Sequence, residues 1–97
     1  MEKKEILVIC TNPAILSTIL RLINKESNWN ATGIDNVQEA CLMRKTRPLD
    51  LVLMGAGLSP EEEDQLIKEL APINCIRHYG GGSGLLYAEI LSVLPNS

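Results

Sequence analysis

Two short apolar segments, residues 6–10 and 49–54, constrain the fold of this 97-residue chain more than any other feature. Both are almost continuously apolar and lack the polar–apolar alternation of a strand that has one face in water. Such segments indicate strands that are covered on both faces, as in a parallel sheet between two layers of helices. They are therefore expected to be central strands.

A helix is predicted after the first of these strands. Asn12 suits the N-cap and Pro13 the first helical position, and apolar residues then recur at helical spacing over residues 15–23. A second helix is predicted to begin after Asn36, which suits its N-cap. The chain therefore alternates between strand and helix from its first residues onward.

The third predicted helix has the clearest start, with Ser59 as its cap and Pro60 as its first residue. Four acidic residues follow at positions 61–64. Although such a group could suggest a metal site, we interpret it as a solvated first turn that complements the helix dipole.

Two weaker strands complete the pattern. Residues 29–34 are predicted to form an edge strand, because they include the polar Asn30 and Thr32 and the flexible Gly33. Residues 73–79 are predicted to form the fourth strand, residues 80–84 a turn and residues 85–94 the last helix.

Four alternations of strand and helix predict an α/β fold with right-handed crossovers. With the most apolar strands in the middle, the expected architecture is a three-layer α/β/α sandwich. Its four-stranded parallel sheet has the order 2-1-3-4 of a flavodoxin-like fold. The length, 97 residues, fits a single domain that spans residues 1–97.

Composition excludes several functional classes. The net charge is −3 and no basic stripe is present, so we expect no nucleic-acid partner. No segment is long enough to span a membrane or to act as a signal peptide, so a cytoplasmic location is expected. The widely spaced Cys10, Cys41 and Cys75 are predicted to be reduced and in or near the core.

Residues 48–55 read Pro-Leu-Asp-Leu-Val-Leu-Met-Gly. This segment resembles the third strand of a response-regulator receiver (CheY-like) domain, which commonly reads Pro-Asp-Leu-Val-Leu-Leu-Asp and whose final Asp accepts a phosphoryl group. Gly55 stands at that position and has no side chain. The resemblance covers residues 4–94 and implies a truncated receiver, because a receiver has five strand–helix units. The missing unit is expected between Ala71 and Ile76.

The resemblance also implies that the phosphorylation site is degenerate. The acidic pair that binds magnesium in receivers is replaced by Cys10, Thr11 and Asn12, and the receiver lysine before the last helix is missing. Phosphoryl transfer needs the carboxylate, the metal and a cation together. The resemblance therefore implies a pseudo-receiver without enzymatic activity or cofactor, acting by protein–protein interaction in bacterial two-component signalling.

A glycine-rich segment suggests an alternative function, a small ligand-binding domain. Four glycines in five residues exceed what a plain turn needs, and we expect them to require positive φ or a close neighbour. Backbone N–H groups between a strand and a helix can bind a phosphate or a nucleotide, or contact a partner. The spacing matches neither the dinucleotide fingerprint nor the P-loop. The residues are Gly80, Gly81, Gly82, Ser83 and Gly84.

The end of the fourth strand is a candidate interface. With one unit missing, this strand becomes a sheet edge, and an exposed edge is normally blunted or paired. Ile76 and Tyr79 offer apolar area, whereas Arg77 and His78 could protect the edge. In receivers the last helix and its neighbouring strand often form a dimer surface, so the resemblance implies a homodimer. The lone His78 is interpreted as structural rather than catalytic.

Overall fold

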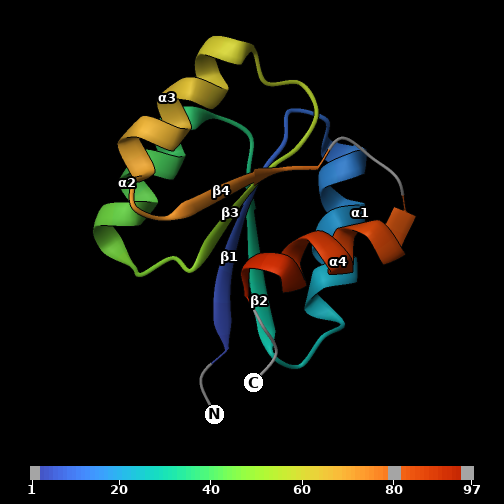
Figure 1. Ribbon diagram of the computed structural model, residues 1–97. Coiled ribbons are helices and arrows are strands. Elements are labelled where there is room, and N and C mark those ends of the chain that lie inside the picture. The colour runs from blue at the N-terminus through green and yellow to red at the C-terminus, as the bar shows by residue number, and fades with distance from the viewer. Residues whose placement is uncertain (1–2, 79–81, 95–97) are drawn as a thin grey trace.

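The computed structural model describes residues 3–78 and 82–94. Four strands and four helices alternate along this part of the chain (Figure 1). The strands form one parallel sheet in the order β2-β1-β3-β4, which confirms the predicted topology. The elements are β1 (Lys4–Ile9), α1 (Pro13–Asn24), β2 (Trp29–Ile34), α2 (Val37–Thr46), β3 (Leu51–Met54), α3 (Pro60–Leu70), β4 (Asn74–Arg77) and α4 (Gly82–Val93).

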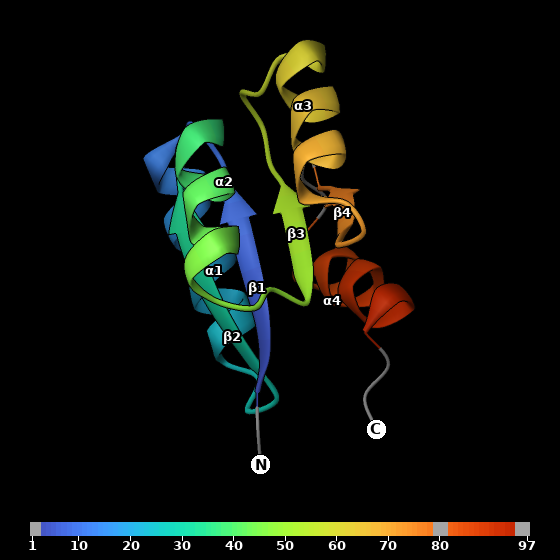
Figure 2. The same cartoon turned by 90° about the vertical axis from the view of Figure 1, so that its left-hand side faces the viewer.

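The helices cover the sheet in two layers. In Figure 1 the helices α1 and α4 lie on one side of the strands, and α2 and α3 lie on the other. Figure 2 shows the strands in their order across the sheet, with β2 at one rim and β4 at the other. The predicted three-layer sandwich is therefore correct.

The core consists of two apolar clusters, one on each face of the sheet. Ile6 and Val8 of β1 pack on the side of α1 and α4, whereas Leu7 and Ile9 pack on the side of α2 and α3. All four residues of β3 are buried as well. The two most apolar segments are thus the central strands, as their sequences predict.

Side-chain caps fix where three of the helices begin. The Asn12 side-chain oxygen accepts hydrogen bonds from the backbone N–H groups of Ala14 and Ile15, at 3.0 and 3.1 Å. Asn36 caps α2 in the same manner. Ser59 caps α3 in a reciprocal capping box, the arrangement that satisfies two otherwise unpaired amides. All three predicted caps are confirmed.

Two predicted boundaries near the end of the chain are wrong. The fourth strand spans Asn74–Arg77 rather than residues 73–79, because the Ile73 N–H still donates to Leu70 O at the end of α3. The last helix begins at Gly82 rather than at Leu85, so Gly82–Gly84 are helical instead of forming a turn. Gly80 and Gly81 lie outside the described residues.

The acidic start of α3 also differs from its interpretation as a solvated turn. Glu63 is buried, with 7% of its surface exposed, and its Oε1 lies 3.0 Å from Nε of Arg77 on β4. A buried carboxylate needs such a partner because desolvation of an unpaired charge is costly. Glu63 therefore ties α3 to the edge strand.

The structure can be compared with the predictions on membrane-spanning segments and on the cysteines. Within residues 3–78 and 82–94, no helix has the length and apolar character needed to cross a membrane. The three cysteines are free: Cys10 is buried, and Cys41 and Cys75 are partly buried. This agrees with their prediction as reduced residues in or near the core.

Candidate functional site

The loops that follow β1 and β3 meet at the carboxyl edge of the sheet, where ligands bind in open α/β folds. The Gly55 N–H donates to Ile9 O at 2.8 Å, and the Thr11 N–H donates to Ala56 O at 3.3 Å. The two loops are therefore joined directly through their backbones.

Gly55, at the position of the expected phospho-acceptor, is buried against Cys10. A Cβ atom at this position would lie 3.0 Å from the Cys10 Cβ, 3.3 Å from its Sγ and 3.3 Å from Ile9 O. Such contacts are tighter than ordinary van der Waals packing. A side chain at position 55 would therefore require Cys10 or the backbone at Ile9 to shift slightly.

Gly57 brings the second loop even closer to the first. Its φ is +99°, a conformation that L side chains rarely adopt, and a Cβ atom there would lie 1.7 Å from the Thr11 Oγ1. Only glycine fits this position. The β3–α3 loop is consequently held against Thr11.

The three residues that replace the expected acidic pair take part in packing and capping. Cys10 is fully buried, and its Sγ lies 3.6 Å from the backbone oxygen of Asn12. The side chain of Asn12 is engaged with the first turn of α1. Thr11 is exposed and lies against Gly57. None of the three offers a carboxylate to a hard cation such as magnesium.

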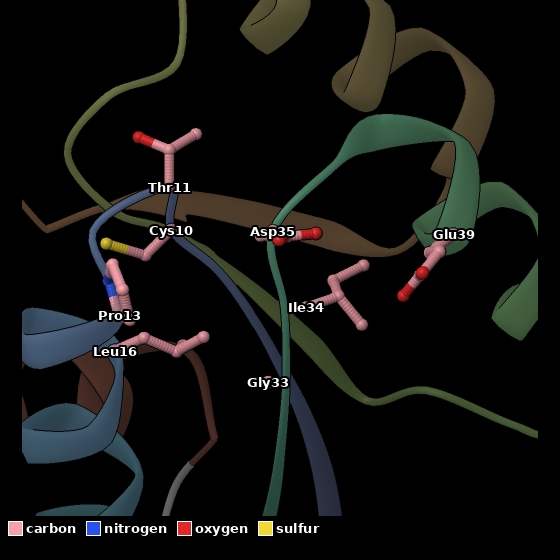
Figure 3. Close-up of a pocket in the computed structure, with 8 residues that line it drawn as sticks. All are labelled: Cys10, Thr11, Pro13, Leu16, Gly33, Ile34, Asp35 and Glu39. Carbon is pink, nitrogen blue, oxygen red and sulfur yellow. The ribbon is translucent and has the colours of Figure 1, made fainter.

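A pocket of about 290 Å³ lies on the other side of these residues, over the end of β2 (Figure 3). Thr11 and Asp35, which the sequence places at the carboxyl ends of β1 and β2, both line it, and Glu39 is a further acidic residue that was not singled out. Its lining residues come from the ends of β1 and β2 and from the first turns of α1 and α2. They are Cys10, Thr11, Pro13, Leu16, Gly33, Ile34, Asp35 and Glu39.

The chemistry of this pocket does not suit a phosphate group. Its lining holds two carboxylates, from Asp35 and Glu39, and no basic side chain. The amides at the adjoining helix starts are already bonded to the side chains of Asn12 and Asn36. In the part of the chain that the structure describes, no three His, Cys, Asp or Glu residues could hold a metal ion together.

His78 follows β4 and is buried, with 6% of its surface exposed. Its backbone N–H donates to Met54 O at 2.9 Å, and its Nδ1 contacts a carboxylate oxygen of Glu89 on α4. His78 thus links the end of the sheet to the last helix. The structural interpretation agrees with this geometry, whereas His78 is too buried to be the interface residue that the sequence suggested.

Of the other predicted interface residues, Ile76 and Arg77 belong to the edge strand β4. Ile76 is partly buried and Arg77 is exposed at the edge, where it pairs with Glu63. Tyr79 lies outside the described residues. Cys75 precedes Ile76 on β4, and its burial raises the pKa of its thiol.

The glycines of the predicted ligand loop are only partly described. The backbones of Gly82, Ser83 and Gly84 form the start of α4. A Cβ atom at Gly84 would meet nothing within 4 Å, and its φ is not positive. The expectation that this glycine needs positive φ or a close neighbour is therefore wrong.

Comparison with solved structures identifies the architecture. A receiver domain from Methylobacillus flagellatus superimposes with a TM-score of 0.71, 14% identity and coverage of 95% of this chain and 99% of that one. The fold is that of a receiver domain. The receiver domain of an HD domain-containing protein from Pseudomonas fluorescens Pf-5 superimposes with a TM-score of 0.69 and 18% sequence identity. The match covers 96% of this chain and 71% of that one. HP1043, an orphan response regulator of H. pylori, superimposes with a TM-score of 0.65 and 17% sequence identity. The match covers 94% of this chain and 96% of that one.

The receiver fold is thus shared with proteins that have little sequence in common with this chain. No protein-family model matches the sequence. The search of curated proteins finds no match either. The resemblance first carried by residues 48–55 is confirmed at the level of the fold, whereas function has to be argued from the residues at the carboxyl edge.

Proposed function

We propose that this chain is a receiver-like module that takes no phosphoryl group and acts by binding another protein in bacterial signal transduction. It catalyses no reaction in this proposal, and its role is to offer a surface. The receiver fold supports the connection to signalling, since receivers are signalling modules, and the carboxyl edge supports the loss of phosphoryl chemistry.

One observation carries the proposal: position 55 has no carboxylate, and a Cβ atom added there would lie in tight contact with Cys10. The nearest atom to a Cβ there would be the Cys10 Cβ, at 3.0 Å. Cys10 itself stands where the resemblance expects an acid. Cys10 therefore lacks the charged group that the resemblance expects at its own position and packs tightly against position 55.

The direct test is exposure to a small phosphodonor. The protein is incubated with acetyl phosphate and magnesium, and its intact mass is measured. We expect no change in mass, because phosphoryl transfer needs an acceptor, a metal and a stabilising cation together. A gain of one phosphoryl group by the native chain would overturn the proposal.

A Gly55→Asp variant separates the missing acceptor from the rest of the site. We expect this variant to remain unphosphorylated, because Cys10 still occupies the neighbouring space and no acidic pair is restored. Gly55→Asn is the matched control, since it adds a side chain of the same size without the acceptor oxygen. A phosphoryl gain by Gly55→Asp alone would show that only the acceptor is missing.

The partner in this proposal is a protein, and the surface that suits one best is the rim of the molecule around β4. A homodimer through this rim follows from the truncation that the receiver resemblance implies. Light scattering measures it directly, because the monomer has a mass of 10.7 kDa.

A further inference from the structure

The pocket over the end of β2 is bordered from both faces of the sheet. Leu16 of α1 packs against the apolar cluster on the side of α1 and α4, whereas Ile34 of β2 belongs to the cluster on the side of α2 and α3. Both residues line the pocket, and in Figure 3 Leu16 lies on one side of the end of β2 and Glu39 on the other. The pocket volume of about 290 Å³ is at the lower end for ligand pockets, so a small molecule or a single side chain would fill it.

The backbone of Gly33 supplies polar groups at this pocket. In a parallel strand, successive residues direct their N–H and C=O groups to opposite neighbours. The Cys10 N–H donates to Ile34 O, so Ile34 faces β1 and Gly33 faces outward. Two residues earlier, the outward groups of Ala31 are bonded to the side chain of Asn24, at 2.7 and 3.3 Å. Within residues 3–78 and 82–94, no group takes that role at Gly33, so its C=O is available to a ligand.

The charged groups of the pocket are both acidic. Asp35 and Glu39 are exposed, and neither forms an ion pair within the described part of the chain. The Asp35 Oδ1 accepts a hydrogen bond from the Asn36 side-chain amide at 3.0 Å, which leaves its negative charge unneutralised. No basic side chain lines the pocket. A cation is therefore the charge that complements it.

The remaining side chains favour an organic cation over a metal ion. Pro13, Leu16 and Ile34 form what we call the apolar lining of the pocket. A hydrated metal ion gains nothing from such a surface, and calcium takes roughly six to eight oxygen ligands. The described residues offer no third His, Cys, Asp or Glu here that could complete a metal site. A cation with an aliphatic stem uses both the carboxylates and the apolar lining.

We propose that this pocket binds a primary alkylammonium group. The ammonium head lies beside the carboxylates of Asp35 and Glu39, and the methylene chain lies along the apolar lining. An ammonium has three N–H donors, so the C=O of Gly33 can accept the hydrogen bond that the two carboxylates leave over. Such a group is carried by small free amines and by the lysine side chains of proteins. The site is separate from the rim around β4 and does not depend on the interaction proposed there.

The first test is a titration of the ¹⁵N-labelled native chain with butylammonium chloride, followed by amide NMR. The outward N–H of Gly33 is the reporter, and we expect saturable shifts at Gly33 and Asp35. Binding should be of millimolar order, because so small a ligand gains little binding energy. Ethylammonium, which lacks two methylene groups, should bind about four- to fifteenfold more weakly. Butanol that shifts these amides as strongly as butylammonium would overturn the proposal, because butanol carries no charge.

The second test removes one charge from the pocket. Glu39→Gln keeps the length of an exposed side chain and should weaken the binding of butylammonium about two- to fivefold, as expected for one exposed ion pair. Glu61→Gln is the matched control, since Glu61 is an exposed acid in the first turn of α3 and lies outside the pocket. It should bind like the native chain. Circular dichroism checks that both variants fold. Equal weakening by the two substitutions would show attraction by net charge alone and overturn the site.

A third arm distinguishes the sources of the group. Nα-acetyl-lysine methylamide carries the same ammonium on a peptide backbone. Shifts at Gly33 with this compound as well as with butylammonium support the site and show that the lysine of another protein can reach it. Shifts with butylammonium alone support the site and assign it to a free amine. No shift with either amine, or a response to magnesium or calcium chloride in their place, would overturn the proposal. None of these results depends on whether the chain takes a phosphoryl group, so the proposed function is tested separately.

Discussion

The carboxyl edge around β1 and β3 and the rim around β4 differ in how completely the chain covers itself. At the carboxyl edge, Gly55 and Gly57 let two loops touch, and a side chain at either position would meet Cys10 or Thr11. At the rim, β4 is half covered, and Leu85 and Leu91 of α4 are 49% and 41% exposed. The contact between the two loops is closely packed, whereas the rim around β4 is partly exposed to solvent.

This difference indicates where function can reside in the molecule. A receiver-like fold would be expected to act at its carboxyl edge, but that edge is closed by close contacts between backbone and small side chains. The contacts between these two loops tolerate little change, and the pocket beside them, over the end of β2, is lined by no basic side chain. An open strand edge next to an apolar helix is a surface that proteins normally protect or pair. Substitutions in the two regions should therefore have very different effects.

The largest effect is expected from Gly57→Ala in the closed region. The added Cβ would lie 1.7 Å from the Thr11 Oγ1, and the φ of +99° is strained for alanine. Strain and overpacking together should lower the free energy of unfolding by about 3 kcal/mol. Thermal unfolding should show a Tm lower by more than about 10 °C in a domain of this size.

A second substitution at Thr11 tests the cause of this loss. Thr11→Ala removes the hydroxyl but leaves the strained φ, so it should restore part of the stability of Gly57→Ala and not all of it. An unchanged Tm in Gly57→Ala would show that the β3–α3 loop moves freely away from Thr11. The edge could then not be described as closed.

A smaller loss, about 1 to 2 kcal/mol, is expected for Gly55→Ala, because its Cβ meets the fixed atoms of Cys10 and Ile9 at 3.0 to 3.3 Å. Urea unfolding measures the change. Gly33→Ala on β2 is the matched control. Its Cβ would come within 2.7 Å of a Leu20 methyl group, 2.9 Å of a Leu16 methyl group and 3.1 Å of the Leu16 Cγ, all of them atoms of flexible side chains and none of the backbone.

Equal losses in Gly55→Ala and Gly33→Ala would contradict the distinction between the closed edge and the rest of the sheet. A larger loss at position 55 would show that close contacts to the backbone and to a Cβ cannot relax. It would also explain physically why position 55 holds glycine. The comparison needs only stabilities, so it stands apart from any test of phosphorylation.

The sequence predicted the fold well because apolar patterning and helix caps are local signals. The runs at residues 6–10 and 49–54 indicated the central strands, and Asn12 and Ser59 indicated helix starts. The predicted start of α4 was too late, because Gly82, Ser83 and Gly84 look like a turn unless packing of the following residues holds them in a helix. Leu86 and Ile90, both fully buried, supply that packing.

The candidate site was less predictable, because it depends on contacts between distant residues. The resemblance pointed to Gly55, but nothing in the sequence shows that Cys10 fills the space beside it or that Gly57 lies on Thr11. Glu63 looked like its solvated neighbours until the structure placed it against Arg77. Such pairings need the register of β1 with β3 and of β3 with β4.

In the open region, Gly84→Ala should stabilise the protein by about 0.4 to 1 kcal/mol. Gly84 is helical, its Cβ would meet nothing within 4 Å, and alanine loses less backbone entropy on folding. Thermal unfolding measures the gain. A loss of stability would indicate an unseen close neighbour, which the ligand-binding alternative for Gly80–Gly84 would require. Native mass spectrometry of the purified chain would then show whether a ligand is bound.

The smallest effect is expected for Leu91→Ser on the outer side of α4. Leu91 is 41% exposed, so serine should change the free energy of unfolding by no more than about 0.5 kcal/mol. Ile90→Ala, one residue earlier, is the matched control, because Ile90 is fully buried and its truncation should cost about 2 to 5 kcal/mol. Urea unfolding should be measured at high dilution, where self-association does not contribute. A large loss for Leu91→Ser under these conditions would mean that this side of α4 is covered by its own chain. The rim would then be as closed as the carboxyl edge, and the chain would have no open surface there for a second copy.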